Sequence, residues 1–207
     1  MDGVLVDGEP LHFEAVNSLL GEEGRSISLE KYKPYMGTKS GWSEMIADLG
    51  LKQPKEHYSS RYRELILRQY QEKSVALPGA VGLVTKLRDA GVPIAICSSS
   101  IQPWVEACLT RLGLWGLFDA VVTGSDVTNG KPEPEIYLLA AERLRKRPAE
   151  CLAIEDAPAG ILSAHAAGMT CWAVRTEYTR GLALPAPERE MESLLEFDIT
   201  EFLGVAA

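Results

Sequence analysis

Residues 80–98, AVGLVTKLRDAGVPIAICS, contain the unit of structure on which the fold is built. Val84 and Leu87 belong to an apolar stripe at helical spacing that stops at Gly91, a residue suited to the left-handed turn after a helix. Residues 93–97, which follow, are apolar on both faces, as in a strand of a buried parallel sheet. The stretch predicts a helix that leads back into a parallel strand.

The same unit of helix, glycine and strand recurs along the rest of the chain. Apolar stripes at helical spacing run into Gly113 and Gly168, and each is followed by a short apolar run. Alternation of helices with apolar strands is typical of the α/β class. We therefore expect a Rossmann-like open parallel sheet flanked by helices, with strands near residues 93–97, 120–123, 151–154 and 170–174.

Residues 8–75 break this rhythm, because they carry helical stripes but no strand pattern. The segment begins at an Asp7-Gly8 turn and ends just before a Leu-Pro-Gly break at residues 77–79, and both places are suited to be hinges. The sequence therefore predicts an inserted all-helical cap, residues 8–75, in an α/β core made of residues 1–7 and 76–207.

Composition and charge limit the classes of function that fit the chain. Its 207 residues are 46% hydrophobic and 24% charged, as in an ordinary soluble globular protein. No apolar run approaches the roughly 18 residues that span a bilayer, and no secretion signal is visible, so we expect a cytoplasmic protein without a membrane partner. A formal charge of −8 opposes nucleic-acid binding, which depends on Lys and Arg. The four cysteines are widely spaced, which predicts free thiols.

Polar residues next to the expected strands are candidates for chemistry, because ligands of an open parallel sheet bind outside the carboxyl ends of its strands. Ser98 follows the first strand, the Glu155-Asp156 pair follows the third, and Asp2 and Lys131 lie in polar turns. Taken singly, each has a structural explanation as a turn, strand-end or solvated residue. Together, a hydroxyl, an ammonium and paired carboxylates supply what phosphoryl transfer needs: a bound cation and donors to the phosphate oxygens.

Four motifs resemble those of the haloacid dehalogenase superfamily, in its branch of β-phosphoglucomutase-like and phosphoglycolate-phosphatase-like proteins with a helical cap. Residues 1–12, MDGVLVDGEPLH, match the first motif, Asp-x-Asp-Gly-Val-x-x-Asp-(Ser/Thr)-Glu-Pro-x-His, from its middle position onward. The other three motifs resemble IAICSSS (94–100), GKPEPEIY (130–137) and IEDAPAGI (154–161). The resemblance covers nearly the whole chain, and it implies the same α/β core with a helical cap.

The resemblance also implies a function: a Mg²⁺-dependent phosphatase that hydrolyses a small phosphorylated metabolite, such as a sugar phosphate, through an aspartyl-phosphate intermediate. In the family pattern Asp2 protonates the leaving alkoxide, then takes a proton from water, and its carbonyl reaches the metal. Lys131 neutralises the phosphate, to which Ser98 and Ser99 donate hydrogen bonds. The implied catalytic residues are Asp2 and Lys131, and the implied metal ligands are Asp2, Glu155 and Asp156.

The chain departs from the family pattern at its first residue. Met1 holds the middle position of Asp-x-Asp, so the nucleophilic aspartate and the apolar strand before it, the first strand of the core, are missing from this chain. Either the start codon is misassigned or the clone shortened, or catalysis has been lost. We expect the 207 residues alone to be almost inactive. An inactive phosphate-binding homologue is one alternative, and a structural α/β domain without a ligand is another.

Substrate choice in this family belongs to the cap, here around residues 35–42, YMGTKSGW. The β-phosphoglucomutase pattern has a lysine just before the glycine and an arginine three residues after it, and this chain has neither. A phosphatase is therefore favoured over a phosphosugar mutase, although Lys39 or Arg61 keeps the mutase open. We nominate His12 and Lys39 as cap residues for the substrate, with a structural role as the alternative for His12. We expect a monomer or a weak homodimer.

Overall fold

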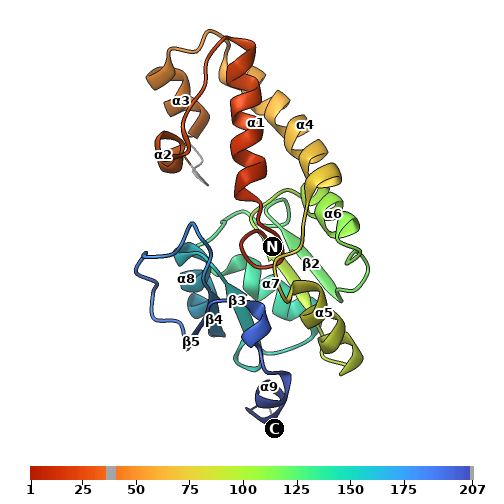
Figure 1. The fold of residues 1–207 in the computed structure, drawn as a ribbon. Helices are drawn as coiled ribbons and strands as arrows, with labels where there is room; N and C mark the ends of the chain where they lie inside the picture. Colours follow the sequence, from red (N-terminus) through yellow and green to blue (C-terminus); the bar gives the residue numbers. More distant parts are fainter. Residues whose placement is uncertain (36–40, 206–207) are drawn as a thin grey trace. The chain divides into compact units, whose positions relative to one another are not determined.

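The computed structural model describes residues 1–35 and 41–205 of the chain. It divides into two compact units, an α/β unit made of Met1–Asp7 with Ser74–Ala207 and a helical unit made of Gly8–Lys73 (Figure 1). These boundaries lie beside the ones expected from the sequence, which fall after residues 7 and 75. Within the described residues, no helix combines the length and the hydrophobicity that crossing a bilayer requires.

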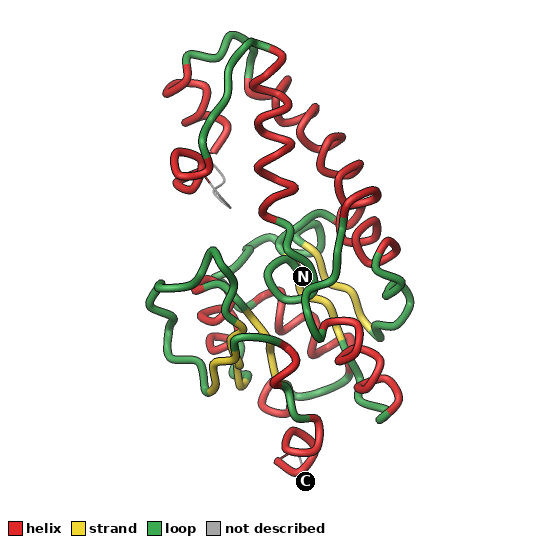
Figure 2. Tube along the Cα trace, in the orientation of Figure 1, coloured by secondary structure: helices red, strands yellow, loops and turns green. Residues whose placement is uncertain are grey.

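The helical unit consists of helices that share one apolar core. Val16 and Leu20 lie four residues apart in the first helix, so they present one face to that core, where Met45 and Tyr58 are also buried. Figure 2 shows the first and last of these helices side by side, in agreement with their packing contacts. The elements are α1 (Glu9–Glu22), α2 (Leu29–Tyr32), the 3₁₀ turn η1 (Lys33–Tyr35), α3 (Gly41–Leu49) and α4 (Lys55–Lys73).

The α/β unit alternates helices and strands along the chain, as its sequence predicts. Its first helix ends in a turn at Gly91, whose φ of 69° lies in the left-handed region that favours glycine. The elements are α5 (Ala80–Asp89), β1 (Ala95–Ser98), α6 (Gln102–Arg111), β2 (Ala120–Thr123), α7 (Glu135–Leu144), η2 (Pro148–Glu150), β3 (Leu152–Glu155), α8 (Pro158–Ala166), β4 (Thr170–Val174), β5 (Arg189–Met191), η3 (Leu194–Glu196) and α9 (Ile199–Val205).

The strands of the described residues form two parallel sheets. One pairs β1 with β2, with Ser98 beside Thr123, and the other places β4 between β3 and β5, with Glu155 beside Ala173. The α/β class and the parallel strands are as predicted. The sequence predicts an open parallel sheet whose first core strand is missing, and the structure divides the described strands into two sheets between β1 and β3. No pattern predicts β5, because a strand of three residues is too short to show a period.

A cavity of about 480 Å³ is lined by residues of both β1 and β3. Its lining is mainly apolar and includes Ile96 of β1, Ile154 of β3, Tyr137 of α7, and Met1. In residues 1–35 and 41–205, β1 pairs only with β2 and β3 only with β4, so one edge of each strand has no strand partner. The sheet is divided because none of the described strands pairs with these two edges. A further core strand stays a prediction.

Candidate active site

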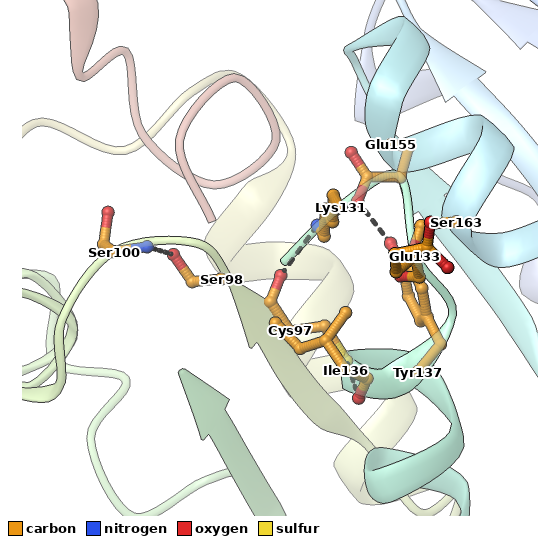
Figure 3. Close-up of polar contacts among 9 residues, drawn as sticks. All are labelled: Cys97, Ser98, Ser100, Lys131, Glu133, Ile136, Tyr137, Glu155 and Ser163. Atoms are coloured by element: carbon orange, nitrogen blue, oxygen red, sulfur yellow. Dashed lines mark hydrogen bonds and ion pairs between the residues drawn. The ribbon is translucent and has the colours of Figure 1, made fainter. Parts of the chain in front are cut away.

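The carboxyl ends of β1 and β3 carry polar residues that the sequence nominates. Ser98 is the last residue of β1 and Glu155 the last of β3, while Lys131 lies in the loop before α7. The Lys131 ammonium donates to the carbonyl oxygen of Cys97 at 3.2 Å and also to Glu155 Oε1. Figure 3 shows it between the two strand ends. Lys131 therefore bridges the carboxyl end of β1 in one sheet and the carboxyl end of β3 in the other. These strand ends, with the loops beside them, form the rim of the α/β unit.

Lys131 and Glu155 form a buried ion pair, with side chains that are 11% and 7% exposed. Burial is the largest single influence and acts to lower the pKa of Lys131, but the charge of Glu155, its hydrogen bond and other nearby charges together outweigh burial, and the pKa of Lys131 is raised. Burial is the largest single influence and acts to raise the pKa of Glu155, but the charges of Lys131 and the N-terminal ammonium, with hydrogen bonds from Lys131 and Tyr137, together outweigh burial, and the pKa of Glu155 is lowered. Both groups are therefore charged at neutral pH, and the rim carries a fixed ammonium.

The Glu155 carboxylate has two further neighbours. The hydroxyl of Tyr137, from α7, donates to the same Oε1 atom that accepts from Lys131 (Figure 3). Burial, and then the charge of Glu155, raise the pKa of Tyr137 well above its ordinary value, so the phenol stays a donor. Gly160, near the start of α8, lies so close that a Cβ there would overlap the carboxylate. The carboxylate is thus held between an ammonium, a hydroxyl and the α8 backbone.

The N-terminal turn and Asp156 meet at the same rim. Gly3, with a φ of 72°, lies against the Asp156 carboxylate, which a Cβ at that position would overlap. The Asp2 carboxylate accepts a hydrogen bond from Ser100 Oγ at 3.4 Å. Burial, and then the charge of Glu155, raise the pKa of Asp156 to about 7. The rim therefore contains two more carboxylates, which belong to Asp2 and Asp156.

Asp2 and Asp156 fit a magnesium ion better than Glu155 does. Mg²⁺ prefers carboxylate and carbonyl oxygens, and it commonly takes one or two protein carboxylates together with water and phosphate oxygens. Glu155 already has Lys131 as its counter-ion, whereas burial, and then the charge of Glu155, raise the pKa of Asp156, so a bound cation would offset the cost of its charged form. Among the described residues, no group of three or more His, Cys, Asp or Glu side chains is arranged to hold a metal.

The loop after β1 holds three consecutive serines. Ser98 is buried, and its Oγ accepts a hydrogen bond from the Ser100 backbone N–H at 3.2 Å. Ser99 passes close to Gly124, after β2, where a Cβ would overlap the Ser99 carbonyl oxygen. These contacts fix the loop at the rim. Phosphate binding by Ser98 and Ser99 stays a prediction.

The cap candidates belong to the helical unit. His12 lies in α1, and its ring nitrogens are 2.7 Å from Tyr62 Oη and 3.0 Å from Tyr70 Oη, both on α4. The His12 side chain therefore joins α1 to α4, as expected if its role is structural. Lys39 lies outside the described residues. Contact of either residue with a substrate stays a prediction.

Comparison with known proteins decides the family. Residues 1–168 match the model of the haloacid dehalogenase-like hydrolase family. The chain belongs to this family. It is 32% identical to YhcW of Bacillus subtilis (strain 168), which is provisionally assigned as a phosphatase, over 98% of this chain and 93% of YhcW.

Two further relatives of this haloacid dehalogenase-like hydrolase are informative. The chain is 33% identical to the fructose-1-phosphate phosphatase YqaB of Escherichia coli (strain K12), over 84% of this chain and 93% of YqaB. The chain is also similar to the crystal structure of CbbY from Rhodobacter sphaeroides in complex with phosphate, with a TM-score of 0.83 and 26% sequence identity. The match covers 95% of this chain and 92% of CbbY. The protein thus belongs with the phosphoric monoester hydrolases of the haloacid dehalogenase-like family.

Sequence reasoning does not single out three residues at the rim of this hydrolase: Ser100, Tyr137 and Gly160. Tyr137 and Gly160 lie inside the third and fourth motifs, so the signal for them is the motif itself. A motif shows which residues recur together, but it does not show which side chain faces which. The contacts of Tyr137 and Gly160 with Glu155 come only from the packing of α7 and α8 around β3.

Proposed function

We propose that the protein is a Mg²⁺-dependent phosphatase of small phosphate monoesters, with sugar phosphates as its substrate class. The observation that carries this proposal is the buried, charged Lys131 at the rim to which Asp2 and Asp156 also belong. An ammonium that is largely removed from water attracts an anion more strongly than one at the surface, because it is screened less. The rim is therefore suited to bind a phosphate group.

Each residue of the rim has a task in the proposed reaction. Asp2 protonates the leaving alkoxide and then takes a proton from the attacking water. Lys131 offsets the charge on the phosphate oxygens, to which Ser98 and Ser99 donate hydrogen bonds. Asp2 and Asp156 are the residues that would hold Mg²⁺, which supplies further positive charge to the same oxygens.

The nucleophile is the remaining part of the proposed reaction. The family pattern puts the nucleophilic aspartate one position before Met1, and the aspartyl-phosphate step depends on it. We therefore expect the 207 residues alone to bind phosphate but to hydrolyse monoesters at a negligible rate. A phosphate-binding protein and a hydrolase would have the same binding site. A chain that is extended by an apolar strand ending in aspartate distinguishes them, because only the hydrolase would then turn over a phosphate monoester.

Sugar phosphates are the substrate class that the relatives favour. YqaB is named for fructose 1-phosphate, and a variant of CbbY from Rhodobacter sphaeroides has been solved with xylulose-(1,5)-bisphosphate. A mutase needs a second cationic site in the helical unit to hold the second phosphate of a bisphosphate. One candidate for that site, Arg61, is ion-paired with Glu22 at 2.6 Å. The lysine and arginine of the mutase pattern are also absent around residues 36–40, which favours the phosphatase over the mutase.

A panel of sugar phosphates and simple monoesters tests the proposal. Phosphate release is measured with Mg²⁺ or EDTA, for the 207 residues and for the same chain preceded by an apolar strand ending in aspartate. We expect release from the extended chain with Mg²⁺ only, and its loss in Lys131→Met and Asp2→Asn. Lys86→Met, at an exposed position of α5, is the control and should release phosphate normally. Undiminished release in either rim variant would overturn the proposed roles.

A further inference from the structure

We infer that Tyr137 is a positioning residue for Lys131 and acts through Glu155, an inference that rests on the proposed function. The Tyr137 hydroxyl contacts Glu155, which is not among the groups proposed to touch the substrate. The Tyr137 ring also lies near the ammonium, with Lys131 Nζ 5.1 Å from the ring centroid. Tyr137 therefore contacts both members of the buried ion pair, as Figure 3 shows.

The geometry of the Lys131 ammonium explains why its partners matter. An ammonium has three N–H donors. In the part of the chain that the structure describes, two acceptors take hydrogen bonds from it: the Cys97 carbonyl oxygen and Glu155 Oε1. Because the three donors have a tetrahedral arrangement, two fixed acceptors also set the direction of the third donor. That third donor is the one left for a phosphate oxygen.

The position of the Glu155 carboxylate thus sets the direction of the third donor. Gly160 fixes the carboxylate on the side of α8, since there is no space even for a Cβ between them. From α7, Tyr137 donates to the same Oε1 atom as Lys131, so two donors share its negative charge. Without the hydroxyl, Lys131 alone offsets the charge on Oε1. The ammonium is then drawn towards the carboxylate and away from the phosphate.

Replacing the hydroxyl without removing the ring is the direct experiment. In Tyr137→Phe we expect the affinity for inorganic phosphate to fall about tenfold, the effect of losing one hydrogen bond in a charged network. Isothermal titration calorimetry on the 207-residue chain with Mg²⁺ measures this affinity, so no turnover is required. Circular dichroism reports whether the variant is folded. An unchanged phosphate affinity in the folded variant would overturn the inference.

The helical unit offers a matched control. The hydroxyl of Tyr58, in α4, donates to the Glu23 carboxylate, and the Tyr58 side chain is buried. Tyr58→Phe therefore removes a bond of the same kind far from the rim in sequence. We expect this variant to bind phosphate as the wild type does. An equal loss of affinity in Tyr58→Phe would mean that the effect in Tyr137→Phe is not specific to the rim.

A double-mutant cycle separates positioning through Glu155 from a general effect on structure. A residue that acts through Glu155 loses its influence once Glu155 is changed. Adding Tyr137→Phe to Glu155→Gln should therefore change phosphate affinity much less than Tyr137→Phe does in the wild type. Equal fold-changes in both backgrounds would show that Tyr137 acts independently of Glu155.

Lys131→Met distinguishes failure of this inference from failure of the proposed function. If this variant binds phosphate as tightly as the wild type, or if the wild type itself does not bind, the proposed function fails and the inference fails with it. If Lys131→Met loses binding while Tyr137→Phe keeps it, the proposed function stands and the positioning role of Tyr137 is wrong. Loss of phosphate binding in both variants, together with a non-additive double-mutant cycle, supports the proposed function and the positioning role of Tyr137.

Discussion

Each unit of the molecule has an ion pair between a lysine and a glutamate, and the two pairs lie in opposite surroundings. In the α/β unit the paired side chains of Lys131 and Glu155 are 11% and 7% exposed, whereas those of Lys73 and Glu14 in the helical unit are 46% and 49% exposed. An exposed pair contributes little because water screens it. A buried pair pays a desolvation penalty that its attraction repays only partly. The difference favours function over stability as the reason for the buried ammonium.

The largest expected effect comes from breaking the buried pair. Lys131→Met leaves Glu155 buried without a counter-ion, so we expect the free energy of unfolding to fall by about 3–5 kcal/mol. Urea denaturation measures it. In the double variant Lys131→Met with Glu155→Leu no charge is left unpaired, and most of the loss should be recovered. A single variant as stable as the wild type would contradict the comparison between the two pairs.

The second effect tests the contact behind Glu155. Gly160→Ala puts a Cβ into space that the Glu155 carboxylate occupies, so we expect overpacking to cost about 1–3 kcal/mol in urea denaturation. Gly82→Ala, inside α5, is the matched control, because a Cβ there meets nothing within 4 Å. That change should stabilise the protein by about 0.5–1 kcal/mol through helix propensity. Stabilisation by both substitutions would show that the Glu155 carboxylate is not held tightly.

The fold follows from the sequence where its signals are local. The apolar stripe that contains Val84 and Leu87 lies in α5 (Ala80–Asp89), and the apolar run 170–174 becomes β4 (Thr170–Val174). Helix ends and buried strands leave such local patterns because each depends on a few neighbouring residues. The division of the sheet between β1 and β3 has no local pattern, since it depends on which strand edges find a partner.

Glu155 and Asp156 show why the site is harder to predict than the fold. Their motif presents them as two acids for one metal, and the sequence alone gives no reason to separate them. Successive residues of an extended segment point to opposite sides, and here Glu155 contacts Lys131 whereas Asp156 lies against Gly3. Lys131 is 24 residues from Glu155 in the chain. Their different contacts therefore depend on a tertiary arrangement that spacing does not encode.

A third effect, smaller per pH unit, is a pH dependence that Asp156 should give to the α/β unit. Burial, and then the charge of Glu155, raise its pKa from 3.8 to about 7. Because the native state then binds this proton more tightly than the unfolded state, stability should rise as the pH falls from about 7 towards 4. One group contributes at most about 1.4 kcal/mol per pH unit. Urea midpoints between pH 8 and pH 5 measure the slope.

Asp156→Asn is the variant that isolates this slope, because the amide does not titrate. The wild type should therefore gain stability relative to the variant as the pH falls from 8 to 5. Mg²⁺ prefers the ionised carboxylate, so it should stabilise the wild type more at pH 8 than at pH 5. A difference that stays constant from pH 8 to pH 5 would rule out Asp156 as the titrating group.

The smallest effect should come from the exposed pair. Lys73→Met removes the partner of Glu14, but both side chains are about half exposed, so we expect a loss of no more than about 1 kcal/mol in the same urea experiment. Salt at 1 M should remove most of that loss. Lys131→Met and Lys73→Met delete the same chemical group, so the difference between their effects isolates burial. Equal losses would mean that burial does not distinguish the two ammonium groups, and the physical basis for assigning phosphate binding to Lys131 would be gone.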